Sequence, residues 1–236
     1  MMNSKTWQDV LCSESRVIAS LYNRRAGEYD ALVHILSLGL DLHYRKVAVE
    51  RLHLQAGARV LDLGCGTGLD LPLLSRAVGH QGEVVGLDLS RKMLQMARQR
   101  IYQKKCPNVS LILGNALDIP FEDSSFDAIF CDYLLSTLSA SRVIEEAFRV
   151  ARKGAHMMFA DDRLPSGWFA SPLKAMGEFV RTGYFNCALP GIKLLKSSLS
   201  SVEVTSHHGG LIFILSGIFQ GPDSYAAGSQ EENPFY

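Results

Sequence analysis

The chain has 236 residues, with 24 basic and 24 acidic side chains, so its formal net charge is zero. A nucleic-acid partner is not expected, because the chain has no basic run that would attract phosphates. With 47% hydrophobic residues, a chain of this length suits one large domain with a full core.

The first segment, residues 1–54, is predicted to be a helical cover. Apolar residues recur there at helical spacing, for example at Val17, Ile18 and Leu21. Trp7 and Asp9 stand where a signal peptide would be apolar, so secretion is not expected.

From residue 59, short apolar segments alternate with helical ones. This order predicts a doubly wound α/β domain with a mostly parallel sheet and helices on both faces. Five strands are expected at residues 59–63, 83–87, 109–113, 126–130 and 155–159. Helices are expected over residues 69–78, after a cap at Ser90, and around residues 143–150.

The end of the domain follows a different pattern. Two strand-like segments, residues 202–206 and 211–219, are joined by a short link that contains Gly209 and Gly210. So short a link requires antiparallel strands, because a parallel return needs a crossover. The prediction is therefore a seven-stranded sheet that finishes in an antiparallel hairpin.

We thus expect a cover at 1–54, a domain at 55–220 with an insertion at 164–200, and a mobile tail at 221–236, which is rich in Gly, Ser, Glu and Pro.

The cysteines and apolar runs suggest where the protein is located. The five cysteines are scattered and lack a Cys-x-x-Cys pair: Cys12, Cys65, Cys106, Cys131 and Cys187. We expect reduced thiols in a cytoplasmic protein, with no disulfide framework and no metal site. The apolar runs at 31–40 and 211–219 are too short to span a bilayer, although contact with a membrane surface stays open.

A glycine-rich turn follows the first strand. Residues 60–68 read Val-Leu-Asp-Leu-Gly-Cys-Gly-Thr-Gly. Such glycines let the backbone turn sharply and approach a ligand, and the following helix points backbone N–H groups at it. A dinucleotide fingerprint would need its third glycine one residue later, where Leu69 stands. The spacing therefore disfavours a nicotinamide cofactor.

Two polar residues follow the next strands. Asp88 can accept both hydroxyls of a ribose, and the alternative is that it caps the helix before Ser90. Asn115 can meet the edge of a base, and an ordinary turn asparagine is an equal alternative.

Together, residues 62–68, Asp88, Asn115 and residues 126–132 resemble the class I S-adenosylmethionine-dependent methyltransferases. The similarity is to the small-molecule branch that includes quinone-biosynthesis C-methyltransferases and bacterial phospholipid N-methyltransferases. It spans about residues 22–219 and implies a Rossmann-like fold, S-adenosyl-L-methionine as cofactor and a small-molecule acceptor.

The resemblance also implies a set of cofactor-binding residues. They are Tyr29, Asp62, Gly64, Cys65, Gly66, Gly68, Asp88, Leu89, Met93, Asn115, Ala116, Leu117 and Cys131. In this assignment the glycines and Asp62 hold the methionine part, and Asp88 binds the ribose. Leu89, Met93 and the segment from Asn115 meet the adenine, and the pair Tyr29-Asp30 closes over the cofactor.

Methyl transfer needs little protein chemistry, because a sulfonium is already an activated donor. The protein must align the acceptor and exclude water, and a base is needed only where the acceptor carries a proton that must leave. Asp132, Asp161 and Tyr29 are the catalytic candidates. The two acids rank above the histidines because ligands bind at the carboxyl ends of such strands.

Two segments are expected to select the acceptor. The insertion at 164–200 carries Trp168, Phe169 and further aromatics that could wall an apolar pocket, although packing over the sheet edge is a common use of such residues. The helical region at about 15–45 would form the opposite wall. The expected acceptor is small and amphipathic or apolar. The alternatives are a phospholipid head-group N-methyltransferase at a membrane and a cofactor-binding regulatory protein without transfer activity.

Overall fold

The computed structural model describes residues 7–37, 39–136, 138–162, 191–207 and 212–226. The helices are α1 (Trp7–Leu36), α2 (Asp41–Glu50), α3 (Leu71–Val78), α4 (Arg91–Gln103), α5 (Ala140–Val150), α8 (Ile192–Ser198) and α9 (Asp223–Ala226). The strands are β1 (Arg59–Leu63), β2 (Glu83–Asp88), β3 (Val109–Leu113), β4 (Phe126–Asp132), β5 (Ala151–Asp162), β6 (Leu199–His207) and β7 (Ile212–Phe219).

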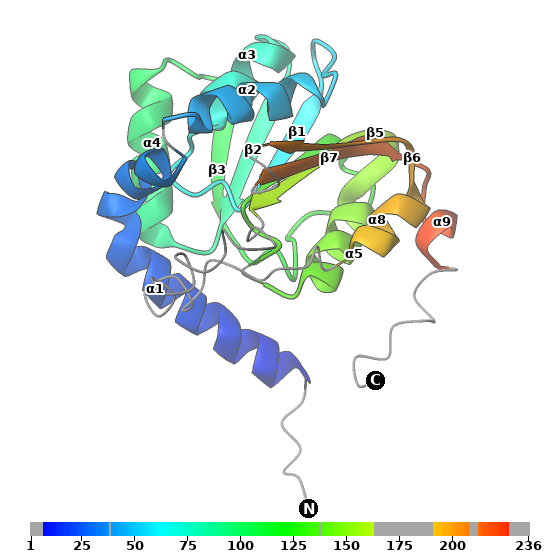
Figure 1. The fold of residues 1–236 in the computed structure, drawn as a ribbon, viewed down its shortest axis with the longest axis horizontal. Coiled ribbons are helices and arrows are strands. Elements are labelled where there is room, and N and C mark those ends of the chain that lie inside the picture. The colour runs from blue at the N-terminus through cyan, green and yellow to red at the C-terminus, as the bar shows by residue number, and fades with distance from the viewer. Residues whose placement is uncertain (1–6, 38, 137, 163–190, 208–211, 227–236) are drawn as a thin grey trace, which may run out of the picture.

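The strands form one seven-stranded sheet in the order β3-β2-β1-β4-β5-β7-β6 (Figure 1). The pairs among β1 to β5 are parallel, and β7 is antiparallel to both β5 and β6. Both the doubly wound sheet and its antiparallel end are therefore confirmed. The strand order reverses between β1 and β4, and ligands bind outside the carboxyl ends of the strands at such a point.

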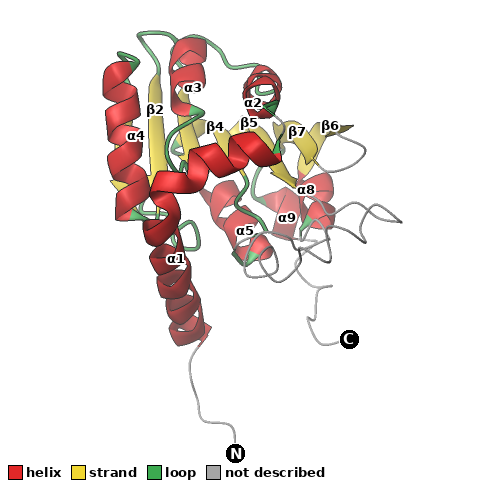
Figure 2. Ribbon diagram, turned by 60° about the vertical axis from the view of Figure 1, so that its left-hand side comes forward, coloured by secondary structure: helices red, strands yellow, loops and turns green. Residues whose placement is uncertain are grey.

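Helices cover both faces of the sheet (Figure 2). On one face, residues of α2, α3 and α4 pack in a core cluster with Val60, Ala128 and Ile214. On the other, α5 and α8 pack against Leu61 and Ile129. Neighbouring residues Val60 and Leu61 thus belong to opposite cores, as expected for a central strand buried on both faces.

Several element boundaries differ from the prediction. The fifth strand begins at Ala151, four residues before the expected start at Ala155, because Ala151 pairs with Phe126 before the register shifts. Ser90 caps α4 as predicted, since its hydroxyl accepts a hydrogen bond from the N–H of Met93 at 3.2 Å.

The N-terminal helices are tied to the sheet domain by side chains. In α1, which packs against α4, Asn23 accepts hydrogen bonds from the hydroxyl of Ser90 and the N–H of Lys92. Ser15, also in α1, accepts one from the amide of Asn115, which follows β3. These contacts place α1 at the carboxyl ends of β2 and β3.

Several predicted features lie partly outside the described residues. The insertion at 164–200 is described only from residue 191, where α8 and the start of β6 lie. Trp168, Phe169 and the other aromatic residues of the insertion lie outside the described residues. Within the segment expected to be a tail, residues 223–226 form α9. The domain boundaries remain a prediction. Among the described helices, none combines the length and apolar character needed to cross a membrane.

Candidate functional site

The glycine-rich turn leaves β1 at the centre of the sheet. Gly64 and Cys65 donate backbone hydrogen bonds to the carbonyl oxygen of Leu87, at 2.8 and 3.0 Å, which fixes the turn to the end of β2. Gly68 has φ +77°, and a Cβ there would lie 3.0 Å from the Cβ of Ala97. A side chain at this position would push the turn away from α4, so the third glycine serves close packing.

A hollow opens beside this turn. It lies between α1 and the carboxyl ends of β1 to β4, the place where ligands bind in open α/β sheets. Seven of the predicted cofactor residues line it: Tyr29, Gly64, Gly66, Asp88, Leu89, Met93 and Ala116.

The other six predicted residues do not line the hollow. The side chains of Cys65, Leu117 and Cys131 are buried in the core, and Gly68 packs on α4. Asn115 uses both ends of its amide within the protein, because its oxygen accepts from the N–H of Leu117 and its nitrogen donates to Ser15.

Asp88 ties the glycine turn to the start of α4. One carboxylate oxygen accepts the N–H of Gly66 at 2.9 Å, and the other accepts the N–H of Ser90 at 2.7 Å. Burial raises the pKa of Asp88, although these backbone donors act in the opposite direction. The residue therefore shapes the turn and also borders the hollow, where its carboxylate could meet ligand hydroxyls.

A buried charged cluster lies behind the hollow. The guanidinium of Arg45, in α2, contacts Asp70 and lies 2.7 Å from Asp132. Burial opposes the charge of Arg45, but these two carboxylates raise its pKa overall. Burial, with the charges of Asp70 and Asp132 adding to it, raises the pKa of Asp62 well above its ordinary value. The cluster thus holds three carboxyl groups and a single guanidinium.

The hydrogen bonding of this cluster is incomplete. Within the described residues, three of its buried atoms have no hydrogen-bond partner: Arg45 Nε, Asp62 Oδ2 and Asp70 Oδ1. Buried polar groups are rarely left unpaired, and such exceptions occur where a ligand or ion binds. With its excess of carboxylates, the cluster suits a cationic group.

Helix α1 covers the hollow and is anchored on the glycine turn. Asp30 accepts hydrogen bonds from the hydroxyl of Thr67 and from Arg100 of α4, each at 2.5 Å. The preceding residue, Tyr29, faces the hollow and packs edge-on against Tyr22, with ring centroids 6.1 Å apart. The Tyr29-Asp30 pair is therefore placed as a cover would be.

The structure separates the three catalytic candidates. Asp132 and Tyr29 border the hollow. Asp161 accepts hydrogen bonds from the N–H and the hydroxyl of Ser136, at 2.8 and 2.9 Å, so it holds the segment after β4.

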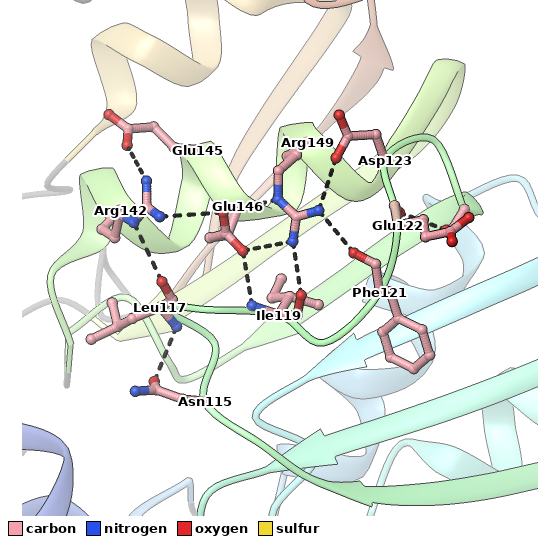
Figure 3. Close-up of polar contacts among 11 residues, drawn as sticks. Asn115, Leu117, Ile119, Phe121, Glu122, Asp123, Arg142, Glu145, Glu146 and Arg149 are labelled. Atoms are coloured by element: carbon pink, nitrogen blue, oxygen red, sulfur yellow. Dashed lines mark hydrogen bonds and ion pairs between the residues drawn. The ribbon is translucent and has the colours of Figure 1, made fainter. Parts of the chain in front are cut away.

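A second charged cluster holds the segment between β3 and β4 (Figure 3). Arg149 of α5 donates to Glu146 and to the carbonyl oxygens of Ile119 and Phe121. Glu146 also accepts the N–H of Ile119 at 2.8 Å. Burial opposes the charge of Glu146, but the bonds from Arg149 and Ile119 prevail and lower its pKa. This cluster fixes the segment that begins with Gly114 and Ala116 in the hollow wall.

Sequence reasoning missed part of the site. Ile18, Ala19 and Tyr22 of α1 line the hollow, and so does Tyr133 directly after β4. Tyr133 could have been found from its place at a strand end. Arg45 gave no such signal, because its partners are 25 and 87 residues away.

Comparison with known proteins identifies the family that this chain resembles. The sequence profile of a family described as a methyltransferase domain matches residues 54–200. A demethylmenaquinone methyltransferase of Lactiplantibacillus plantarum is 34% identical over 158 residues, covering 66% of this chain and 67% of that protein. A demethylmenaquinone methyltransferase of Listeria monocytogenes is 28% identical over 216 residues, covering 82% of this chain and 91% of that protein.

Solved structures share the fold. A SAM-dependent methyltransferase from Aquifex aeolicus gives a TM-score of 0.56 at 24% identity and covers 74% of this chain and 89% of that one. A geranyl diphosphate methyltransferase in complex with SAM gives a TM-score of 0.62 at 16% identity and covers 82% of this chain and 91% of that one.

Proposed function

The chain belongs to the S-adenosylmethionine-dependent methyltransferases, and from this premise we propose that it methylates the hydroxylated aromatic ring of a quinol. The observation that carries the proposal is the likeness to demethylmenaquinone methyltransferases, which extends over 82% of the chain in the relative from Listeria monocytogenes. The apolar lining of the hollow, with Ile18, Leu134 and Leu138, supports an apolar acceptor.

The cofactor would lie in the hollow beside the glycine turn, and there it supplies a methyl group activated by a sulfonium. Asp88 is the residue we propose for the ribose, and Leu89 and Met93 for the adenine. Asp62 is proposed for the ammonium group, since its Oδ2 is buried and unpartnered within the described part of the chain. The excess of carboxylates around Arg45 supports this choice, because a cation would offset it.

Asp132 is the group we propose to take the proton from a quinol hydroxyl while the neighbouring ring carbon accepts the methyl group. The hydrogen on that carbon then leaves as a proton and the ring oxygen regains one, so that one proton is released in all. It lies at the border of the hollow, and burial raises its pKa well above the ordinary value. A carboxyl group whose pKa is raised is better matched to proton transfer near neutral pH. Tyr29, across the hollow, would help to exclude water.

The cytoplasmic location of the protein stays a prediction. A cytoplasmic location still rests on the scattered cysteines. The phospholipid N-methyltransferase and regulatory alternatives gain no support from the relatives matched.

The test is a transfer assay with methyl-labelled S-adenosylmethionine and a reduced, short-chain demethylmenaquinol. The expected result is an organic-soluble product heavier by one methyl group in place of a ring hydrogen. Asp88→Ala serves as the matched variant, and its cofactor affinity should fall about tenfold or more, because a charged hydrogen bond contributes roughly 1.5–3 kcal/mol. Label on an aminophospholipid, with none on the quinol, would overturn the proposal.

A further inference from the structure

Helix α2 has a charged residue in the middle of its buried face. The buried residues of this helix are Asp41, Arg45, Ala48 and Val49, and Arg45 is 5% exposed. Arginine is almost never buried to this degree unless it is paired. A buried ion pair adds little to stability over aliphatic side chains of similar volume. Packing alone therefore does not explain an arginine at this position.

The guanidinium of Arg45 contacts the last residue of β4 and the residue that follows it. One of its terminal nitrogens donates to Asp132 Oδ2 at 2.7 Å. Its central carbon lies 5.8 Å from the centre of the Tyr133 ring, within the range of a cation–π contact. Asp132 and Tyr133 line the hollow beside the glycine turn, and Arg45 does not. Arg45 therefore acts on the hollow through these two side chains.

Tyr133 has a backbone conformation that needs support from its surroundings. Its φ is +54°, in the left-handed region that aromatic residues rarely adopt. Its N–H donates to the carbonyl oxygen of Ala160 at 2.9 Å, and the guanidinium of Arg45 lies over its ring. Strain of this kind persists only where the surrounding structure over-determines it, and it is concentrated at ligand sites. The contact with Arg45 is therefore part of what fixes the wall of the hollow at Tyr133.

Arg45 also decides the charge around Asp132. The titratable groups around Asp132 and its arginine come from each element packed there: Tyr29 of α1, Asp41, Tyr44 and Arg45 of α2, Asp62 of β1, Asp70 before α3, Asp161 of β5, and Tyr133 after β4. Of these groups only Arg45 carries a positive charge. Burial and the charges of Asp70 and Asp161 raise the pKa of Asp132, and Arg45 opposes them. Without Arg45, Asp132 would stay protonated to a higher pH.

We propose that Arg45 is a positioning residue of the transfer reaction, which holds the carboxylate of Asp132 and the ring of Tyr133 in place at the wall of the hollow. The proposal rests on the proposed function, in which Asp132 takes the proton of the acceptor hydroxyl. It adds a residue that lies outside the hollow and acts through two residues that line it. A merely structural arginine would leave the ionisation of Asp132 unchanged, and a positioning arginine would not.

The first experiment follows methyl transfer against pH. Arg45→Gln removes the charge beside Asp132, and Arg45→Lys keeps a positive charge there. The assay uses S-adenosylmethionine and the short-chain demethylmenaquinol. In Arg45→Gln, the acid limb of the kcat profile should move to higher pH by about one unit or more, because an opposite charge this close shifts the pKa of a carboxylate by that much. Arg45→Lys should restore most of the wild-type profile.

Arg51→Gln is the matched control. Arg51 directly follows α2 and donates to Glu203 of β6 at 3.0 Å, in an exposed contact. It does not line the hollow, so this variant should keep the wild-type profile. If Arg45→Gln does not fold, the comparison is made between Asp70→Asn and the double variant Arg45→Gln/Asp70→Asn, in which neutral side chains replace both members of the buried pair. The double variant should then have its acid limb at the higher pH.

The second experiment measures Asp132 directly and does not depend on turnover. Protein labelled with carbon-13 at its aspartate carboxyl groups and saturated with S-adenosylhomocysteine is titrated by NMR. Asp132→Asn identifies the resonance of Asp132. This signal should titrate at a higher pH in Arg45→Gln than in wild type, and in Arg51→Gln it should titrate as in wild type.

The outcomes separate this inference from the proposed function. An acid limb that Arg45→Gln leaves unchanged, or that moves as far in Arg45→Lys or Arg51→Gln, overturns the role of Arg45. A shifted Asp132 titration in Arg45→Gln, without methylation of any quinol by wild type, supports the hold of Arg45 on Asp132 and overturns the proposed reaction. Methylation together with an Asp132 titration that Arg45→Gln leaves unchanged supports the reaction and overturns the role of Arg45.

Discussion

Two arginines at opposite faces of the sheet differ in how fully they are bonded. Arg149 in α5 uses all three guanidinium nitrogens, on Glu146, on Asp123 and on two backbone carbonyl oxygens (Figure 3). Arg45 in α2 bonds Asp70 and Asp132 through one nitrogen, and its Nε has no partner in the described chain. The first cluster is complete, and the second is not.

This difference in hydrogen bonding distinguishes a cluster that holds the fold together from a cluster that belongs to a binding site. A charged cluster whose bonds are all made holds its segments rigidly and offers a ligand nothing to bind. An incomplete cluster that is deeply buried costs free energy in the empty protein, and a ligand that completes it recovers that free energy. The incomplete cluster here includes Asp132, which borders the hollow.

The largest expected effect comes from breaking the complete cluster. Glu146→Ala leaves Arg149 without its main partner, so we expect a loss of about 3 kcal/mol in the free energy of unfolding, near the low end for a broken buried pair because Arg149 keeps Asp123. Urea denaturation measures this loss, and cofactor affinity of the folded variant should not change. Glu145→Ala is the control, since it removes only an exposed contact with Arg142 and should cost less than about 0.5 kcal/mol. Equal losses in the two variants would contradict the idea that Glu146 anchors a scaffold.

The two clusters should respond to pH in opposite directions. The pKa of Glu146 is lowered from 4.5, so its stabilisation is present above that value and is lost as pH falls through the folded-state pKa. The pKa of Asp62 is raised well above 3.8, so its contribution is present below that value and is lost as pH rises through the folded-state pKa.

Asp62→Asn sharpens this contrast. Without cofactor, the variant should lose stability less steeply than wild type as pH rises above 4, by up to about 1.4 kcal/mol per pH unit for one proton. Glu146→Gln should instead flatten the decline on the acid side. Unfolding curves across pH 3 to 8 measure both slopes. Identical slopes in Asp62→Asn and wild type would show that Asp62 does not carry the raised pKa.

The smallest expected effect concerns the cover. Asp30→Ala removes the contacts of α1 with Thr67 and Arg100. Because both ends of this contact are partly exposed, we expect about 1 kcal/mol, seen as a cofactor affinity about fivefold weaker. Hydrogen exchange in residues 15–37 should be faster than in wild type and should slow when cofactor binds. Exchange that does not respond to cofactor in wild type would count against α1 as a cover.

The sequence by itself determined the elements whose causes are local. The strand and helix rhythm from residue 59 predicted the parallel sheet, and the short link before residue 212 required an antiparallel end. Ser90 as the cap of α4 and the glycine turn were also readable, because capping and turn chemistry act within a few residues. Seven of the thirteen predicted cofactor residues line the hollow, and five of these, all but Tyr29 and Met93, lie at or just after strand ends.

Only the tertiary structure decided how distant charges meet. In the folded protein Arg45 pairs with Asp70 and Asp132. Asp161 accepts a hydrogen bond from Ser136 and does not line the hollow. The tertiary structure also placed Tyr133 at the edge of the hollow. Such contacts join elements far apart in the chain, and whether a buried polar atom finds a partner depends on packing across those elements. No pattern of neighbouring residues carries that information, because the free energy of a buried charge depends on its whole three-dimensional surroundings.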